Sequence, residues 1–223
     1  MSFNIAIDGP SGAGKSTIAK KTAKKLNFIY IDTGAMYRAM ALYFLKNQVD
    51  TADEDKIAAC CGEIDISISY LDGEQQVILN GENVTGSIRT EEVGNTASAT
   101  SGYQSVRKKL VELQRNLAIK ENVIMDGRDI GTCVLPNAQL KIFLTASVLT
   151  RGKRRYHELV NKGVPASLEE VCKDMKERDD RDMNREISPL KMAEDAILLD
   201  TSDMNIDEVV QTILGYVTER KVR

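Results

Sequence analysis

The sequence predicts an α/β fold in which helices flank a parallel β-sheet. Two features support it: short apolar runs that end at polar or glycine clusters, and helix-like segments between them. The runs are short and rich in β-branched residues, as buried parallel strands are. They are FNIAIDG at 3–9, FIYIDTG at 28–34, NVIMDGRD at 122–129, LKIFLTAS at 140–147 and AILLDTSD at 196–203.

Three segments between or after these runs are predicted to be helices. The first is GKSTIAKKTAKKLN at 14–27. The second, at 105–120, places four apolar side chains along one face, namely Val106, Leu110, Leu113 and Leu117. The last helix carries the apolar residues Val209, Val210, Ile213, Leu214 and Val217.

One region predicts a small antiparallel insertion, from about residue 63 to about residue 88. Ile64, Ile66, Ile68 and Tyr70 alternate with polar residues, and the dipeptides Asp-Gly and Asn-Gly follow at the spacing of hairpin turns. We expect two or three strands here. No internal repeat or low-complexity linker interrupts the chain, so we expect a single domain over 1–223 with this lobe attached.

The composition restricts the classes of function. The 223 residues carry 30 Lys and Arg against 33 Asp and Glu, a net charge of −3, so no overall positive field attracts nucleic acid. The four cysteines include no C-x-x-C pair, which argues against a disulfide framework or a zinc site. MSFNIAIDG lacks the features of a secretory signal, and no apolar run reaches the roughly 18 residues of a membrane helix. We therefore expect a soluble, cytoplasmic protein.

Residues 9–16, GPSGAGKS, match G-x-x-x-x-G-K-[ST] in full, and the motif follows a predicted strand and opens a predicted helix. Backbone N–H groups of such a loop surround phosphate oxygens, and the helix amino terminus adds a favourable partial charge. Lys15 is expected to reach the β- and γ-phosphates and Ser16 to ligate Mg²⁺. The alternative is an ordinary glycine-rich turn. The predicted nucleotide-binding residues are Gly9, Pro10, Ser11, Gly12, Ala13, Gly14, Lys15, Ser16 and Thr17.

A nucleoside triphosphate site leaves three classes open: a phosphotransferase, a nucleotide-driven switch, and a motor or nucleic-acid ATPase. A guanine-nucleotide switch would carry N-K-x-D, whereas the nearest match is NKGV at 161–164, and Val164 cannot accept a hydrogen bond from guanine. A motor would usually be larger, or basic on one face. A phosphotransferase is therefore favoured, and it needs a second anion site beside the first.

Arginines at the ends of predicted strands are candidates for that second site. Arg38 follows the second strand, and Arg128 with Asp129 follows the third. Ligands of open α/β sheets bind at the carboxyl ends of the strands, so these residues should converge near the loop. Asp126 is a candidate outer ligand of the metal. Taken singly, Asp126 could instead cap a helix and Arg38 could be a surface arginine.

The stretch KERDDRDMNR at 176–185 adds further arginines. On a helix, Arg178, Arg181 and Arg185 would point one way, with Asp182 close enough to orient Arg178 or Arg185. Guanidinium groups suit the charge of a transferring phosphoryl group. The alternative is a solvated helix face with ion pairs. The single histidine, His157, is expected to be a surface or helix residue and not a catalyst.

Five motifs in their order and spacing, GPSGAGKST, IDTGAMYR, VRKKLVELQR, DGRDIGT and ERDDRDMNR, resemble those of the bacterial cytidylate kinases, a family of nucleoside monophosphate kinases. The resemblance runs nearly from end to end and includes the insertion. It implies a P-loop NTPase-type core with a helical lid at about 150–186. It also implies phosphoryl transfer from ATP to CMP or dCMP, with Mg²⁺ as cofactor, in pyrimidine nucleotide metabolism.

The resemblance also implies roles for individual residues. Arg38, Arg128 and Arg185 match positions that hold the acceptor phosphate, and Ser98, Arg107 and Asp129 match positions that read cytosine. Asp182, with Arg178 nearby, matches the position that contacts the ribose, and Thr33 stands in the acceptor site where a serine is common. Arg154 and Arg181 match lid residues over the triphosphate. The catalytic residues implied in this way are Lys15, Arg128, Asp129, Arg181 and Arg185.

The same resemblance divides the expected single domain into a core at 1–32, 90–149 and 187–223, an acceptor-nucleotide region at 33–108, and the lid. It implies small-molecule partners, no nucleic acid and no membrane, and we expect a monomer. Two alternatives stay open: a kinase of broader UMP and CMP specificity, and an ATP-binding regulatory or nucleic-acid module.

Overall fold

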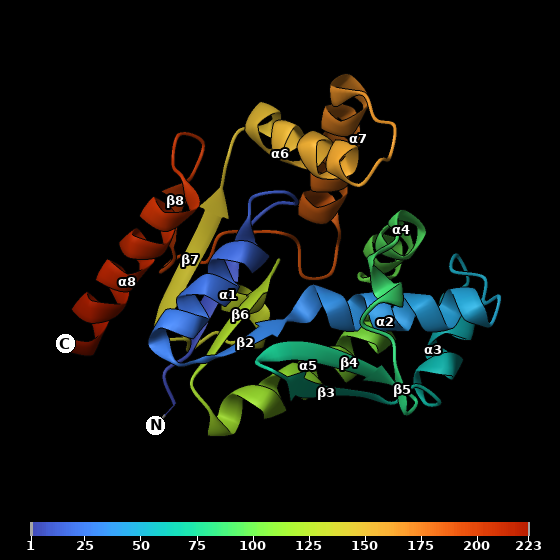
Figure 1. Cartoon of the computed structure of the whole chain (residues 1–223). Helices are drawn as coiled ribbons and strands as arrows, with labels where there is room; N and C mark the ends of the chain where they lie inside the picture. Colours follow the sequence, from blue (N-terminus) through green and yellow to red (C-terminus); the bar gives the residue numbers. More distant parts are fainter. Residues whose placement is uncertain (1, 223) are drawn as a thin grey trace. The chain divides into compact units, whose positions relative to one another are not determined.

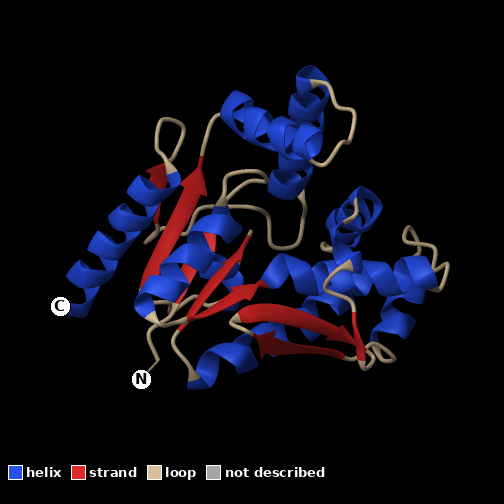
Figure 2. Cartoon of the chain, in the orientation of Figure 1, coloured by secondary structure: helices blue, strands red, loops and turns tan. Residues whose placement is uncertain are grey.

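The computed structural model describes residues 2–222, and the chain divides into two compact units. Residues up to 30 and from 121 onward form the first unit, and residues 31–120 form the second. Figures 1 and 2 show the helices and strands of the chain.

The first unit contains most of a parallel sheet and the helices that flank it. The sheet has five strands in the order β2-β6-β1-β7-β8, and the chain enters the second unit within β2. Its elements are β1 (Ile5–Asp8), α1 (Lys15–Leu26), β2 (Ile29–Asp32), β6 (Val123–Gly127), a π-helical turn η2 (Ile130–Val134), β7 (Leu140–Thr145), α6 (Val148–Asn161), α7 (Leu168–Asn184), β8 (Ile197–Asp200) and α8 (Ile206–Val222). The α/β class, the five strands and the helical region at 150–186 are confirmed.

The register of the strands brings their carboxyl ends to one edge of the sheet. β1 pairs in parallel with both neighbours, so Asp8 lies opposite Gly127 of β6 and Phe143 of β7. β7 pairs with β8 in the same direction, with Thr145 opposite Asp200. Polar residues that follow these strands therefore start from the same edge, as the sequence predicted.

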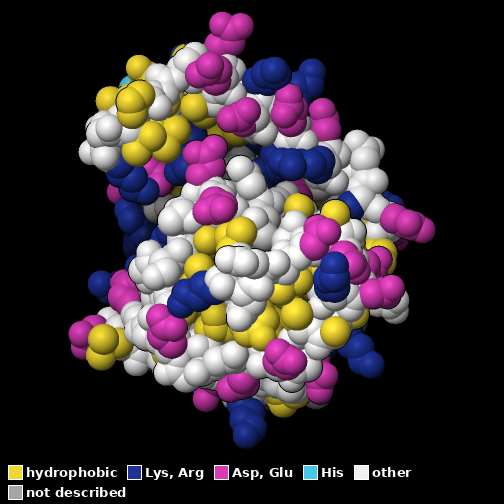
Figure 3. All heavy atoms as spheres, turned by 90° about the vertical axis from the view of Figure 1, so that its right-hand side faces the viewer, with side chains coloured by type: hydrophobic (Ala, Val, Ile, Leu, Met, Phe, Trp, Pro, Cys, Tyr) yellow, Lys and Arg dark blue, Asp and Glu magenta, His cyan; other side chains and the backbone are white. Residues whose placement is uncertain are grey.

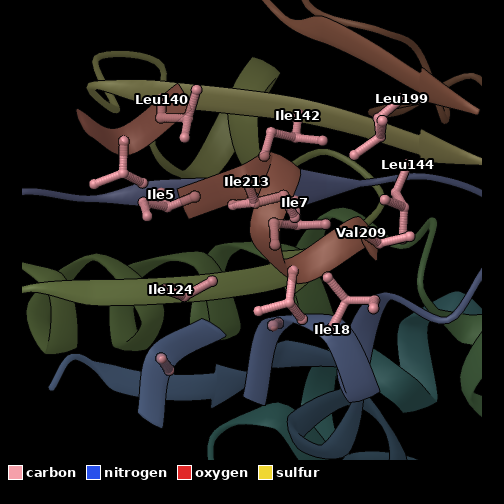
Figure 4. Close-up of a cluster of buried hydrophobic side chains, with 14 residues drawn as sticks. Ile5, Ile7, Ile18, Ile124, Leu140, Ile142, Leu144, Leu199, Val209 and Ile213 are labelled. Atoms are coloured by element: carbon pink, nitrogen blue, oxygen red, sulfur yellow. The ribbon is translucent and has the colours of Figure 1, made fainter. Parts of the chain in front are cut away.

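A core of aliphatic side chains holds α1 and α8 to the sheet. Ile5 and Ile7 of β1 are fully buried, and Figure 4 shows them in one cluster with side chains of β6, β7 and α8. The predicted apolar residues of the last helix are confirmed in the core, with Val209, Val210, Ile213 and Val217 buried and Leu214 partly buried.

The second unit contains a small antiparallel sheet and several helices. The sheet has the order β3-β4-β5, which confirms the predicted insertion. Its two turns, Asp72-Gly73 and Asn80-Gly81, have positive φ at both residues, as tight hairpin turns require. The elements are α2 (Thr33–Lys46), α3 (Glu54–Cys61), β3 (Ile66–Leu71), β4 (Glu74–Leu79), β5 (Glu82–Asn83), the short helix η1 (Ser87–Arg89), α4 (Glu91–Thr100) and α5 (Gln104–Lys120).

Helix α5 buries a somewhat different face from the one its apolar pattern predicts. Val106 and Leu110 are fully buried, but Leu113 and Leu117 are only half-buried. Gln114 takes the next buried position instead, and its amide atoms have no hydrogen-bond partner within residues 2–222. The apolar stripe indicates the helix, but tertiary packing decides which residues are buried.

Gly9, which follows β1, has φ of +147° and lies against the next strand. A Cβ atom on Gly9 would overlap the carbonyl oxygen of Leu144 in β7. Only glycine therefore allows the chain to leave β1 so close to β7.

We expect Gly9→Ala to lower the free energy of unfolding by about 3 kcal/mol or more, because both the backbone angle and the overlap are unfavourable. Gly163→Ala is the matched control, since Gly163 also has positive φ but has nothing within 4 Å of an added Cβ. The control should cost about 1 kcal/mol. Urea unfolding of both variants measures the difference, and equal losses would contradict the close approach.

Candidate active site

The loop at residues 9–16 connects β1 to α1, as the phosphate-loop motif requires. Gly12 and Gly14 have φ of +72° and +90°, which residues with side chains rarely adopt. Gly14 is the N-cap of α1 and offers no side-chain oxygen to the first turn of the helix. Backbone N–H groups at this end therefore keep their capacity to bind an anion.

Lys15 is the first residue of α1, and its side chain is buried against the loop. Its Nζ donates to the carbonyl oxygen of Pro10 at 2.7 Å. Burial, followed by the positive charge of Arg128, lowers the pKa of Lys15 to about 7 in spite of the nearby carboxylates of Asp126, Asp8 and Asp182. A phosphate in the loop would supply the negative charge that a buried ammonium group needs.

Ser16 lies beside the buried carboxylate that ends β6. Its Oγ donates to Oδ2 of Asp126 at 2.9 Å, and the hydroxyl of Tyr30 donates to Oδ1 at 2.8 Å. A serine oxygen and a carboxylate oxygen side by side are donors that Mg²⁺ accepts. Asp126 thus lies in β6 beside Ser16, and Tyr30 is a neighbour that the sequence analysis did not identify.

Arg128 and Asp182 form an ion pair near the end of β6. Nε of Arg128 donates to Oδ2 of Asp182 at 2.7 Å. Burial raises the pKa of Asp182, but the positive charge of Arg128 and its hydrogen bond outweigh this effect and leave the pKa below its usual range. Arg178 and Arg185 contribute to the lowering. Arg128 is thus an ion-pair partner of Asp182 that helical spacing did not predict, and the two arginines that spacing did predict lie near enough to influence its charge.

Arg185 lies close to Asp129 but not on the helix to which the sequence analysis assigned it. Helix α7 ends at Asn184, and Arg185 has an extended backbone. The spacing that would align it with Arg178 and Arg181 therefore does not apply, and Arg181 is exposed while the other two are partly buried. Nη2 of Arg185 lies 3.8 Å from Oδ1 of the buried Asp129, and its Nε donates to the carbonyl oxygen of Ser188 at 2.6 Å.

Two arginines of α6 contact the phosphate loop. Arg151 is 4% exposed and pairs with Asp179 of α7 at 2.7 Å. It also donates from Nη1 to the carbonyl oxygen of Ser11 at 2.8 Å. Arg154 donates from Nη2 to the carbonyl oxygen of Thr201 at 2.8 Å and from Nη1 to that of Ala13 at 3.4 Å. Arg154 was predicted to lie near the triphosphate, whereas Arg151 and Asp179 carry no local motif and were missed.

The second unit holds its own cluster of charges at the start of α2. Oδ1 of Asp32 accepts from the backbone N–H of Ala35 at 2.9 Å and so caps the helix that begins at the buried Thr33. Oδ2 of Asp32 accepts from Arg38 at 3.0 Å and from Arg89 at 3.4 Å. Arg38 is thus a partly buried side chain whose guanidinium group is oriented by an ion pair.

Two further predicted residues also lie in the second unit. Arg107 of α5 is buried and donates from Nη1 to the hydroxyl of Tyr37 at 3.2 Å. The buried Oγ of Ser98 in α4 has no hydrogen-bond partner in the described part of the chain. A buried hydroxyl without a partner is costly, which favours a role in binding a ligand.

The remaining predictions concern the surface. His157 is exposed on α6, with its ring 5.6 Å from that of Tyr156, as expected of a helix surface residue. Acidic and basic side chains are interspersed over the face drawn in Figure 3. Within residues 2–222, no helix is long and apolar enough to cross a membrane. The same residues contain no cluster of three or more histidine, cysteine or acidic side chains suited to a metal ion.

Comparison with known proteins gives matches over nearly the whole chain. The cytidylate kinase family model matches residues 5–219. A cytidylate kinase from Halalkalibacterium halodurans is 51% identical over 218 residues, which is 98% of each chain. A cytidylate kinase from Caldicellulosiruptor bescii is 52% identical over 212 residues, or 95% of this chain and 94% of its own.

Two solved structures are similar in fold alone. A gluconokinase from Sinorhizobium meliloti covers 97% of this chain and 92% of its own, with a TM-score of 0.51 and 12% identity. An uncharacterized protein from Eubacterium ventriosum covers 97% of this chain and 99% of its own, with a TM-score of 0.55 and 15% identity. Both likenesses support the arrangement of helices around a mostly parallel sheet.

We expect Arg151→Met to lower the free energy of unfolding by about 3 to 5 kcal/mol, because it leaves the carboxylate of Asp179 buried and unpaired. Lys162→Met is the control, since Lys162 immediately follows the same helix and pairs with its exposed Glu158. Exposed pairs contribute little, so the control should stay within about 1 kcal/mol of the parent. Urea unfolding measures both, and similar small losses would contradict the importance of the buried pair.

Proposed function

This chain belongs to the cytidylate kinase family, and we propose that it transfers the γ-phosphoryl group of ATP to the phosphate of CMP or dCMP, giving ADP and CDP or dCDP. The observation that carries this proposal is the match to cytidylate kinases at about 50% identity over nearly the full chain. The charged groups around the phosphate loop supply the chemistry.

We propose that the phosphate loop binds the triphosphate of ATP. The glycine backbone angles and the uncapped start of α1 suit an anion. Lys15 would contact the transferring phosphate, and Arg154, which lies beside Ala13, would contact the triphosphate from the lid. Thr17 and Arg181 are exposed in the free chain and are proposed to contribute to the same site.

The acceptor phosphate is proposed to be bound by Arg38, Arg128 and Arg185. Nε of Arg38 is buried and lacks a hydrogen-bond partner in the described chain, which leaves a donor for an anion. Arg128 and Arg185 are held by carboxylates of their own unit and are therefore oriented before a ligand arrives. The acceptor is a phosphate that is largely dianionic at neutral pH, so direct in-line transfer needs no general base.

We propose that Ser98, Arg107 and Asp129 recognise cytosine, because they combine donors with a carboxylate acceptor. Cytosine presents an amino donor beside two acceptors, and uracil reverses part of this pattern. UMP would leave buried groups unpaired and should be a poor substrate. Asp182 and Arg178 are proposed to contact the sugar, and Thr33 to line the acceptor site.

Mg²⁺ is proposed to bind at Ser16 and Asp126, whose oxygens fit it by chemistry and position. In kinases this ion also binds substrate phosphates and neutralises part of their charge. The chain's own contribution is to present the two oxygens at the end of β6. We further propose that the chain acts as a monomer in the cytoplasm and that α6 and α7 close over ATP and exclude water.

A coupled assay of ADP formation tests the function directly. With each ribo- and deoxyribonucleoside monophosphate supplied in turn, CMP and dCMP should be phosphorylated much faster than UMP, AMP or GMP. Comparable rates with UMP would identify a broader pyrimidine kinase. Turnover stimulated by an oligonucleotide and not by CMP would overturn the proposal in favour of a nucleic-acid module.

We expect Arg128→Ala and Arg185→Ala each to lower the rate of transfer on the order of 10² to 10³, because charge stabilisation is the main catalytic effect in this reaction. Arg155→Ala is the control, since Arg155 lies on α6 and pairs with Glu158 one turn further along the same helix. The same assay measures all three. Rates within threefold of the parent for Arg128→Ala or Arg185→Ala would remove those residues from the site.

We expect Ser16→Ala to raise the Mg²⁺ concentration needed for half-maximal rate by about tenfold or more, because one oxygen ligand is lost. Thr212→Ala, which removes a hydroxyl bonded to the backbone of α8, is the control. Titration of the rate with Mg²⁺ measures both. An unchanged Mg²⁺ requirement in Ser16→Ala would contradict the assignment.

A further inference from the structure

Asp8 is a buried carboxylate to which the proposed function gives no role. It is the last residue of β1 and immediately precedes Gly9 of the phosphate loop. It is 5% exposed. Its two oxygens accept hydrogen bonds from the backbone N–H groups of Ile130 and Gly131, each at 2.7 Å.

These two hydrogen bonds fix the turn that follows Arg128 and Asp129. The turn is the π-helical segment η2, and its N-cap residue, Asp129, makes no side-chain cap. Asp8, at the end of β1, accepts instead from the first two N–H groups of this turn. The approach is close, because a Cβ on Gly131 would lie 3.3 Å from Oδ2 of Asp8 and 3.1 Å from Cδ of Lys141.

Asp8 therefore contacts the chain on both sides of Arg128 and Asp129. On one side, Asp8 pairs in the sheet with Gly127, and on the other it binds the N–H of Ile130. The two intervening residues carry the side chains that pair with Asp182 and Arg185. A change at Asp8 would act first on the orientation of these two residues.

A carboxylate is the group that this geometry requires. Two N–H donors point at two oxygens, whereas the amide of asparagine offers one acceptor and one competing donor. The carboxylate is retained at a cost, because burial raises the pKa of Asp8 to about 6 in spite of the two backbone hydrogen bonds. A residue that destabilises the folded chain at neutral pH and is still present is better explained by function than by stability.

We propose that Asp8 is a positioning residue for the acceptor nucleotide: its carboxylate holds the turn after β6 and so orients Arg128 and Asp129 next to the phosphate loop. The inference rests on the proposed function. It adds a link between the strand that leads into the ATP loop and the segment that binds CMP.

The test is Asp8→Asn, which preserves shape and removes one acceptor. We expect kcat/KM for CMP to fall on the order of 10²-fold, since misplacement of binding groups by about 1 Å has effects of this size. The dissociation constant of ATP, measured by calorimetry, should change less than threefold. Asp200→Asn is the control, because Asp200 also ends a strand of the sheet and accepts from a backbone N–H, that of Ser202 at 2.9 Å.

The stability of the variant separates positioning from a structural role. The pKa of Asp8 is raised from 3.8 to about 6 in the folded chain, so the parent loses stability as the pH rises from about 4 to about 6. Asparagine does not ionise. As the pH rises over this range, the Tm of the parent should therefore fall relative to the Tm of Asp8→Asn. A residue important only for folding would instead give a variant with lower Tm throughout.

The parent protein provides a measurement that needs no variant. The charged groups that face Asp8 are Asp129 and Lys15, with Lys141 on the far side of Gly131. The amide signals of Ile130 and Gly131 in nuclear magnetic resonance spectra should titrate together, with a midpoint near pH 6. If Asp8→Asn does not fold, this titration of the parent tests whether Asp8 binds the two N–H groups of the turn.

Several outcomes would overturn the inference. They are an unchanged kcat/KM for CMP, equal losses toward ATP and CMP, or amide signals of Ile130 and Gly131 that do not respond to pH. Failure of the proposed function is distinct from these, since the parent itself would then show no phosphorylation of CMP.

Discussion

The parallel register of β1 between β6 and β7 is the constraint on which the rest of the first unit depends. It sets Asp8 opposite Gly127 and Phe143, so the strands end at one level. The phosphate loop and the segment with Arg128 both start from this edge. A slip of one residue would turn the buried isoleucines of β1 to the opposite face and remove Gly9 from the carbonyl of Leu144. The core and the site are therefore specified by the same pairing.

Around this edge the first unit buries several charges, and each has a specific compensation. Two backbone N–H groups bind Asp8, Arg128 binds Asp182, and Arg151 binds Asp179. Charges taken out of water are costly unless they are paired and hydrogen-bonded. In return, these pairs fix the orientation of the charged side chains. Guanidinium and carboxylate groups already held in place can stabilise a charged transition state without rearranging when it forms.

The sequence predicts those features that local chemistry decides. The phosphate loop follows from its glycines and lysine, the strands from apolar runs, and the small sheet from Asp-Gly and Asn-Gly turns, whose residues have positive φ. Long-range partners do not follow in this way. Asp182 pairs with Arg128, 54 positions away, and Arg151 reaches Ser11, 140 positions away. Such pairs depend on how α6, α7 and the sheet pack, and no periodicity in the sequence encodes them. Helix α7 ends before Arg185 without a glycine or proline to mark the end.

The position of β1 in the sheet also has a consequence for biosynthesis. The ribosome makes this strand well before both of its neighbours, β6 and β7, which begin after residue 120. At roughly 5 to 20 residues per second, β1 waits on the order of ten seconds for a partner. Residues 31–120, by contrast, form a continuous unit that can be complete before β6 emerges. The apolar residues Ile5 and Ile7 thus lack their partners in the sheet until β6 and β7 are made, so the core of the first unit can close only after residues 31–120 have been translated.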